Sequence, residues 1–260
     1  MRLLGYIFIL ALLTVMSCDD EVVVGLPDGR DYFPLEVGRI LEYRIDSIIF
    51  DDAGGGNVMD TFSGFIREHI TGKFEGLTGD TAYIIERSFR RKNTDPWQVT
   101  YIYTESTDLT SAYRQEGNIT QVKMQFPLRD ITQWDPTMFI DPTIEVEVGT
   151  ELIEMFSNWE GKVLQLDATE TIGSFEFDNV LSCQQADDDN DIERRFVLEK
   201  YAKGVGLILR VDSILDSRCK RLGELLPCLE SDGNGNLVPQ PWSKKAEKGY
   251  ILRQEITSFK

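Results

Sequence analysis

Short runs of alternating apolar and polar residues, rich in β-forming side chains, cover most of this 260-residue chain and constrain its fold more than any other feature. The run from Leu41 to Ile49 is the clearest, because apolar residues stand at nearly every second position, as in a half-buried strand. Similar runs lie at 61–71, 82–90, 98–104, 119–126, 143–148, 161–172, 174–184, 193–202, 206–215 and 250–259. No segment shows a long apolar face with the period and caps of an amphipathic helix. The sequence therefore predicts an all-β fold: a curved antiparallel meander that forms a half-barrel or a lipocalin-like barrel, with few helices.

The order of segments along the chain predicts one folded domain behind a leader. Residues 1–17 are predicted to be a signal peptide, and residues 18–30 a flexible tether. Residues 31–260 then form a single β-rich domain, which is long enough to bury a sizeable core. Within it, residues 219–248 are rich in glycine and proline and indicate an irregular excursion between strands.

Two pairs of segments in this domain resemble each other. Residues 44–49 (RIDSII) are similar to residues 210–215 (RVDSIL), and residues 64–71 are similar to residues 249–257. Alternating strands share residue types by chance, which is the simpler explanation. A true duplication would instead predict two equivalent hairpins at opposite ends of the curved sheet.

The N-terminal segment has the layout of a secretory signal peptide. Arg2 precedes an apolar run from Leu3 to Met16, and a small residue, Ser17, follows it. This run is shorter than the roughly 20 residues that a membrane-spanning helix needs. The order Val15-Met16-Ser17-Cys18 resembles the bacterial lipobox. That resemblance implies that the chain is cut before Cys18 and that Cys18 carries covalent lipid.

Charge limits the classes of partner that this protein can have. The chain has 44 acidic and 27 basic residues, and loss of residues 1–17 removes only the basic Arg2, which leaves a net charge of about −18. Nucleic acid is not expected as a partner, since its binding requires a basic face. Attraction to anionic headgroups is equally unexpected. We therefore expect membrane contact through the lipid on Cys18 alone, and a glycan or a protein as the partner at the cell surface.

The cysteines other than Cys18 are Cys183, Cys219 and Cys228. In an exported, oxidising setting three cysteines cannot all pair within one chain. Cys219 and Cys228 flank only eight residues, so we predict a local disulfide between them and a free, buried Cys183. A bond from Cys183 to either of the other two, or no bond, is the alternative.

No arrangement of residues in the sequence matches a known catalytic motif. The single histidine, His69, lies in a strand-like run and is expected to be an ordinary strand residue. One histidine excludes histidine-rich zinc sites and leaves only one candidate for a catalytic triad. No phosphate-binding loop is present. We therefore expect no enzymatic activity and no cofactor other than the lipid, although paired carboxylates for glycoside hydrolysis could be drawn from so many acids.

Calcium is the one metal for which the sequence offers a candidate site, and a weak one. Asp187, Asp189 and Asp191 match the first three ligand positions of an EF-hand loop. The match then fails, because Ile192 stands where the loop needs glycine and Leu198 where it needs glutamate. A solvated hairpin loop is the simpler interpretation.

Three stretches resemble predicted lipoproteins of the Bacteroidetes type. Residues 31–38 (DYFPLEVG), followed by Tyr43, are similar to the F-P-L-x-x-G-x-x-W-x-Y phrase that opens the folded domain there, with Leu41 in place of the usual tryptophan. Residues 173–181 and 199–208 are similar to the closing strands of the same proteins. The resemblance implies a curved antiparallel β domain with no assigned reaction and no catalytic residue to carry over.

Acidic residues directly after Cys18 add to this resemblance. In that group of bacteria an acidic stretch after the lipidated cysteine is similar to a surface-export signal, and Asp19-Asp20-Glu21 fits it. This implies an outer-membrane lipoprotein that faces outward. A periplasm-facing lipoprotein is the alternative.

Three functions follow from these observations as hypotheses. The leading one is a lipid-anchored, non-catalytic binding or structural module of the cell envelope. The second is a carrier of lipid or another hydrophobic ligand, which requires an apolar cavity inside the barrel. The third is a glycan-active enzyme with two carboxylates that face each other across a cleft, about 5–9.5 Å apart.

Overall fold

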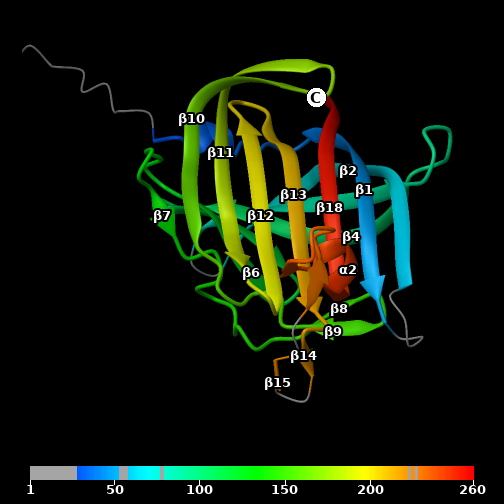
Figure 1. Cartoon of the computed structure of the whole chain (residues 1–260). Coiled ribbons are helices and arrows are strands. Elements are labelled where there is room, and N and C mark those ends of the chain that lie inside the picture. The colour runs from blue at the N-terminus through cyan, green and yellow to red at the C-terminus, as the bar shows by residue number, and fades with distance from the viewer. Residues whose placement is uncertain (1–27, 53–57, 77–78, 222–223, 226–227) are drawn as a thin grey trace, which may run out of the picture.

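Nearly all regular structure in the computed structural model is β-strand, which confirms the predicted all-β fold (Figure 1). The structure describes residues 28–52, 58–76, 79–221, 224–225 and 228–260. Helical structure in these residues is confined to one 3-10 turn, η1 (Arg30–Tyr32), and one short helix, α2 (Trp242–Lys245). No helix in the described part of the chain is long and apolar enough to cross a membrane. The leader and Cys18 lie outside the described residues.

Two antiparallel meanders form one sheet of twelve strands. The first meander contains β1 (Ile40–Asp51), β2 (Val58–Glu75), β3 (Thr81–Arg90), β4 (Gln98–Thr107), β5 (Ser111–Glu116) and β6 (Ile119–Gln125). The second contains β10 (Gly161–Ile172), β11 (Phe175–Asp189), β12 (Glu193–Ala202), β13 (Gly206–Ser217) and β18 (Ala246–Phe259). β1 pairs with β18, so the first and last long strands of the domain lie side by side and join the two meanders.

The two edges of this sheet meet, so the sheet is nearly closed into a barrel. β7 (Gln133–Trp134) pairs with β10 at one edge. Just after β7, the carbonyl of Pro136 accepts a hydrogen bond of 3.0 Å from the backbone N–H of Val122 in β6, the other edge. The Trp134 indole N–H also donates to the Val122 carbonyl at 3.1 Å. These contacts cover both edge strands, which would otherwise expose unpaired backbone groups.

Additional short strands cover the lower end and the outer face of the sheet, as Figure 1 is oriented. β8 (Val146–Val148) and β9 (Glu151–Ile153) form a hairpin below the barrel. The excursion after β13 contains β14 (Lys220–Arg221), β15 (Glu224–Leu225), β16 (Leu229–Ser231) and β17 (Leu237–Pro239). It ends with α2, where Trp242 packs against the buried cluster of Phe50, Leu215 and Ala246. β18 starts at Ala246, so the excursion ends earlier than the predicted residue 248.

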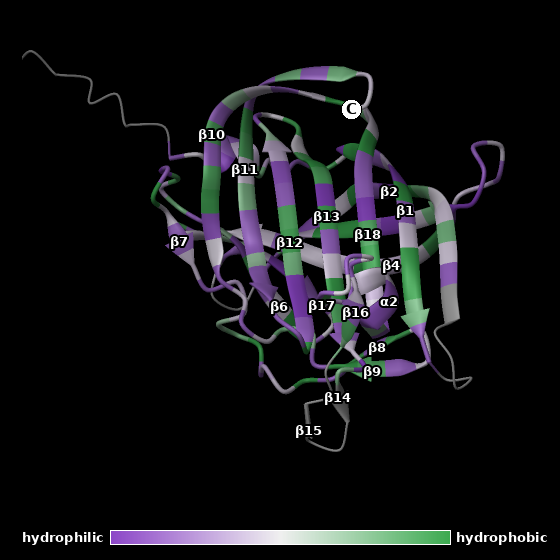
Figure 2. Ribbon diagram, in the orientation of Figure 1, coloured by the Kyte–Doolittle hydropathy of each residue, from purple (hydrophilic) through white to green (hydrophobic). Residues whose placement is uncertain are grey.

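Hydrophobic and hydrophilic residues alternate along the long strands, as the colours of the ribbon in Figure 2 show. The larger apolar cluster includes Tyr43, Leu181 and Ile208. A smaller cluster joins the segment after β9 to the sheet, with Phe156 and Trp159 packed near Ile214. Charged side chains occupy the inner face between these clusters, and they form the site described below.

The structure does not show the placement that a true duplication of the two similar hairpins would predict. The strand order β2-β1-β18-β13 puts them next to each other in the middle of the sheet, not at its opposite ends. Their registers also differ, because Ile45 pairs with Gly64 whereas the corresponding Val211 pairs with Arg253. Alternation alone explains the similarity, since inward and outward positions of any two strands favour the same residue types.

Candidate functional site

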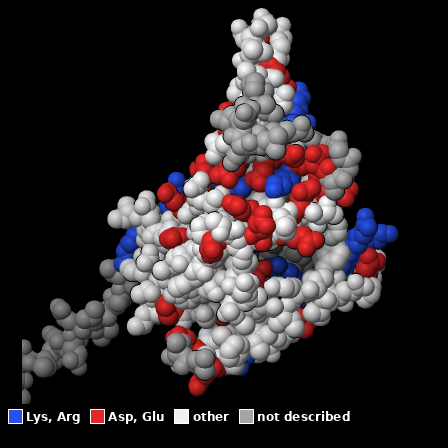
Figure 3. Space-filling model, turned by 90° about the horizontal axis from the view of Figure 1, so that it is seen from below, with Lys and Arg blue, Asp and Glu red and all other residues white. Residues whose placement is uncertain are grey.

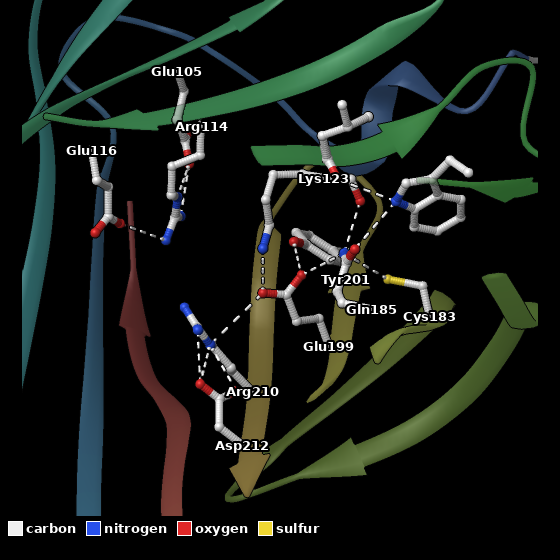
Figure 4. Close-up of polar contacts among 12 residues, drawn as sticks. Glu105, Arg114, Glu116, Lys123, Cys183, Gln185, Glu199, Tyr201, Arg210 and Asp212 are labelled. Atoms are coloured by element: carbon white, nitrogen blue, oxygen red, sulfur yellow. Dashed lines mark hydrogen bonds and ion pairs between the residues drawn. The ribbon is translucent and has the colours of Figure 1, made fainter. Parts of the chain in front are cut away.

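A buried ion pair joins opposite walls of the barrel. Lys123 of β6 lies 2.6 Å from the Glu199 carboxylate of β12, and the two side chains are 2% and 0% exposed (Figure 4). Glu199 also accepts hydrogen bonds from the Gln185 amide at 2.9 Å and the Tyr201 hydroxyl at 2.8 Å. Burial opposes the charge of Glu199, but Lys123 and Arg210 outweigh it and hold the pKa of Glu199 at about 2. The carboxylate therefore stays ionised at neutral pH.

β13 extends this network toward the lower end. Arg210 holds the buried Asp212 carboxylate with an Nη2–Oδ2 distance of 2.7 Å, and the Tyr250 hydroxyl donates to Asp212 at 3.3 Å. The Arg210 guanidinium also lies 3.9 Å from Glu199. Burial disfavours its charge, but these carboxylates raise the pKa of Arg210 above its usual value. Burial and the charge of Arg210 both lower the pKa of Lys123, although Glu199 opposes them.

A second cluster of ion pairs lies on β2 to β5. Arg114 donates to Glu105 through Nε at 2.9 Å and Nη2 at 2.7 Å, and Arg87 holds Glu68 at 2.9 Å. Burial raises the pKa of Glu105. Burial also opposes ionisation of Glu68, but Arg87 and Arg114 outweigh it and lower its pKa. Glu116, at the lower end of β5, lies 3.9 Å from Arg114.

The two clusters together are balanced in charge. Apart from Glu116, whose side chain is 37% exposed, four basic side chains face four acidic ones: Arg87, Arg114, Lys123 and Arg210 against Glu68, Glu105, Glu199 and Asp212. Such pairing is what allows charges to stay inside a protein, because an isolated buried ion costs several kcal/mol. The interior thus offers both hydrogen-bond donors and acceptors without a net charge.

A pocket of about 290 Å³ lies between this network and the segment that covers the lower end of the barrel. Arg114 and Arg210 are at its inner end, and its wall is largely apolar. The wall residues are Ile119, Val146, Val148, Met155, Phe156 and Trp159, with the polar Glu116, Gln121, Glu147 and Tyr250. Figure 3 views this end and shows basic side chains inside a hollow, with acidic side chains on the surrounding surface.

A much smaller pocket, of about 40 Å³, lies on the other side of Arg114. Tyr43, Tyr103 and the two carboxylates of Glu68 and Glu105 line it. This volume suffices for a water molecule or two but not for an organic ligand. Arg114 lines both pockets and therefore lies between this small space and the larger pocket at the lower end.

The stretches that resemble Bacteroidetes-type lipoproteins lie together at the upper end of the barrel. The Arg39 guanidinium donates to the Gly204 carbonyl at 2.6 Å, and the Gly204 N–H donates to the Asp31 carbonyl at 2.7 Å. The ring of Phe33 lies 6.2 Å from that of Tyr201. These residues fasten the start of the domain to the turn between β12 and β13, so their role in this structure is to pack the domain.

The cysteines that follow Cys18 lie away from the pocket. Cys219 and Cys228 form a disulfide with a Cα–Cα distance of 5.5 Å, and Cys183 is free and buried. Burial raises the pKa of the Cys183 thiol, which keeps it protonated and unreactive. The disulfide joins the end of β13 to the excursion on the outer face.

Of the three calcium candidates, Asp187 and Asp189 lie at the end of β11 and Asp191 lies in the loop that follows, which is shorter than the sequence predicted. Asp189 pairs with Arg194 at 2.6 Å, and Asp191 lies 3.6 Å from Lys245. Asp187 is on the exposed face of the strand. In the described residues, no group of three acidic, histidine or cysteine side chains is arranged to hold a metal ion.

The tryptophan side chains, whose rings could stack on a sugar, have other contacts in this structure. Trp97 lies between two guanidinium groups, 4.3 Å from Arg67 and 4.1 Å from Arg90. Trp134 is buried at the junction of β6 and β7, and of the four tryptophans only Trp159 lines the 290 Å³ pocket. His69 lies in β2 opposite Ile40, an ordinary strand position.

Sequence reasoning missed the residues that form the network and the inner end of the pocket. Arg114, Lys123, Glu199 and Arg210 were not singled out, because charged residues in strands are expected to face solvent. One signal was present. In Glu193–Ala202 charged residues occupy both sets of alternating positions, and such a strand has no face that is wholly apolar.

No protein-family model matches this chain, and no curated protein matches it. A solved structure from Parabacteroides distasonis, described as a candidate lipoprotein, aligns with 88% of this chain and 98% of its own. The TM-score is 0.32 and the identity is 8%. A similarity at this level supports no conclusion about the fold or the function of this chain.

Proposed function

We propose that this protein is a lipid-anchored, non-catalytic binding module of the cell envelope, and that the pocket at the lower end of its barrel is the binding site. One observation carries the binding part: the interior is filled by apolar clusters and paired charges, yet about 290 Å³ remains open beside Arg114 and Arg210. Ligand sites are typically such concave, largely apolar spaces with a few convergent polar groups.

The nature of the pocket favours binding of a polar ligand over carriage of a lipid. A hydrophobic carrier needs an apolar cavity, but guanidinium groups and carboxylates line the inner end of this one. An acyl chain that reached them would have to desolvate their remaining polar edges without replacing the lost hydrogen bonds. The hydrophobic-carrier hypothesis is therefore the weaker one.

The anchor rests on the leader sequence. After cleavage before Cys18, the acyl chains would be the attachment to the membrane, since the net charge of the protein repels anionic headgroups. Cys18→Ala should abolish fatty-acid labelling and release the protein from the membrane fraction. Protease treatment of intact cells then distinguishes an outward-facing from a periplasm-facing protein, because only the periplasm-facing protein is protected from cleavage. Unchanged labelling of Cys18→Ala would disprove the anchor.

Filling the pocket tests the binding function. Val148→Trp places an indole in the pocket, while Val99→Trp adds the same group at a strand position that is 56% exposed. Small-molecule extracts of the producing bacterium's envelope and growth medium are added, and bound mass is measured by native mass spectrometry. We expect the wild type and Val99→Trp to retain a ligand that Val148→Trp does not. Equal retention by all three, or none by any, would overturn the assignment of the site.

A further inference from the structure

We infer that the pocket takes a neutral, polyhydroxylated ligand of about the size of one sugar ring. This inference rests on the proposed binding function and names its ligand class. The volume sets the size: about 290 Å³ is at the lower end of the roughly 300–1,000 Å³ found for ligand pockets. One ring fits this space, whereas a long oligomer could place only its terminal unit there.

The charges around the pocket exclude ligands with a strong net charge of either sign. An anion would meet Glu116 and Glu147 in the pocket lining, on a protein with a net charge of −17. A cation at the inner end would meet Arg114 and Arg210. Each guanidinium already has a carboxylate partner, so neither attracts an anion strongly enough to offset Glu116 and Glu147. A neutral ligand meets neither repulsion.

The guanidinium groups nevertheless retain hydrogen-bonding capacity. Glu105 takes Nε and Nη2 of Arg114, and Asp212 takes Nε and Nη2 of Arg210. This leaves Nη1 of each group without a hydrogen bond to any described residue, with Glu116 3.9 Å from Nη1 of Arg114, and Figure 4 shows the two groups pointing toward each other from different walls. Carboxylate and amide oxygens of Glu116 and Gln121 add acceptors. Alternating donors and acceptors match a set of hydroxyl groups, each of which both donates and accepts.

The apolar wall supplies the other half of the recognition. Phe156 and Trp159 lie 5.5 Å apart and line the pocket together with Met155 and Val148. A sugar ring has hydroxyl groups at its rim and C–H groups on its faces, so it can bury a face against aromatic side chains while its rim is hydrogen-bonded. An apolar wall opposite paired charges thus fits a polyhydroxylated ring better than an aliphatic ligand.

Sugars that share a ring and differ in charge test this inference directly. Glucose, galactose and mannose are compared with glucuronate and galacturonate and with glucosamine and galactosamine, by calorimetric titration in low salt. We expect at least one neutral sugar to bind at least tenfold more tightly than its acidic and its amino counterparts, and Val148→Trp to lose that binding. Tighter binding of a uronate or an amino sugar would overturn the neutral class.

Glu147→Gln checks the electrostatic reason without touching the inner end of the pocket, because Glu147 is an exposed residue of the lining. It should raise the affinity of the uronate and so bring it closer to that of the neutral sugar. An unchanged ratio of the two affinities would contradict the electrostatic argument.

The sugar titrations and the extract experiment together distinguish the ligand class from the binding function. If no sugar binds but the wild type still retains a ligand from the extracts that Val148→Trp does not, the ligand class is wrong and the binding function stands. If the extracts also yield none, both are wrong.

Discussion

Lys123→Met is the sharpest test of the view that paired charges hold this barrel together. Methionine keeps the length of the side chain but removes the ammonium group that lies 2.6 Å from Glu199. Glu199 is fully buried and would then keep only the Gln185 and Tyr201 hydrogen bonds and the more distant Arg210. Its charge would be largely uncompensated inside the protein.

The magnitude follows from this environment. Removal of one partner of a buried ion pair typically costs about 3–5 kcal/mol of unfolding free energy. Because Arg210 remains 3.9 Å away, we expect the lower end of that range, about 3 kcal/mol. Glu199→Gln alone should cost a similar amount, since it leaves Lys123 buried without its partner. The double variant should be more stable than the sum of the single effects predicts, by about 2 kcal/mol.

Urea unfolding at pH 7, followed by tryptophan fluorescence, measures these values. Lys244→Met is the matched control, because the Lys244 side chain is 61% exposed and its pair with Glu230 is expected to contribute below about 1 kcal/mol. The reasoning fails if Lys123→Met costs no more than the control. It fails equally if the effects of Lys123→Met and Glu199→Gln are additive, since additivity would mean that the two groups do not interact.

Three further predictions concern pH, backbone geometry and the disulfide. The pKa of Glu199 falls from 4.5 to about 2 on folding, so its contribution of about 3 kcal/mol is present above pH 4.5 and lost as the pH falls toward 2. Glu199→Gln should therefore lose less stability than the wild type between pH 5 and 2. An equal loss of stability in the two proteins would refute this. Gly249→Ala should cost more than about 2 kcal/mol of unfolding free energy in urea, because its Cβ would lie 2.1 Å from a backbone carbonyl oxygen at a φ of +121°. Gly38→Ala is the control, since Gly38 has a similar φ of +98° but no atom near the added Cβ. Equal costs for the two variants would exclude the steric cause. Replacing Cys219 and Cys228 by serine should lower the free energy of unfolding by about 2–3 kcal/mol, as expected for a short disulfide loop. Ligand retention should not change, because the disulfide lies away from the pocket. Loss of the ligand would contradict the assignment of the pocket as the binding site.

The strands that could be predicted from the sequence are those in which β-forming residues alternate with polar ones over a long run. β10 and β12 lie at the predicted residues, and β1 extends the predicted run by only one residue at its start and two at its end. β5 was missed, because its sequence SAYRQE places the buried Arg114 where an apolar residue is expected. The sequence predicted a half-barrel or a barrel but did not decide between them, since the link between Val122 and Pro136 is made by backbone atoms.

The site was harder to predict than the fold for a physical reason. Whether a charged strand residue faces solvent or the interior depends on register, and one step along the strand reverses its direction. Glu199 and Lys200 are neighbours in sequence, but only Glu199 faces the inside of the barrel, with a side-chain exposure of 0% against 20%. The sequence alone cannot show which of two adjacent charges has a partner 76 positions away.

The position of the pocket agrees with the proposed anchor. The described chain begins at the upper end, where Asp31 contacts the turn between β12 and β13, while the pocket lies at the lower end next to β8. A lipid on Cys18 would attach to the chain before the upper end, so the pocket would face away from the membrane. The acidic surface around the hollow would favour the same orientation, because anionic headgroups repel it. The orientation that leaves the pocket open to ligands from solution is thus the one that both the chain path and the charge favour.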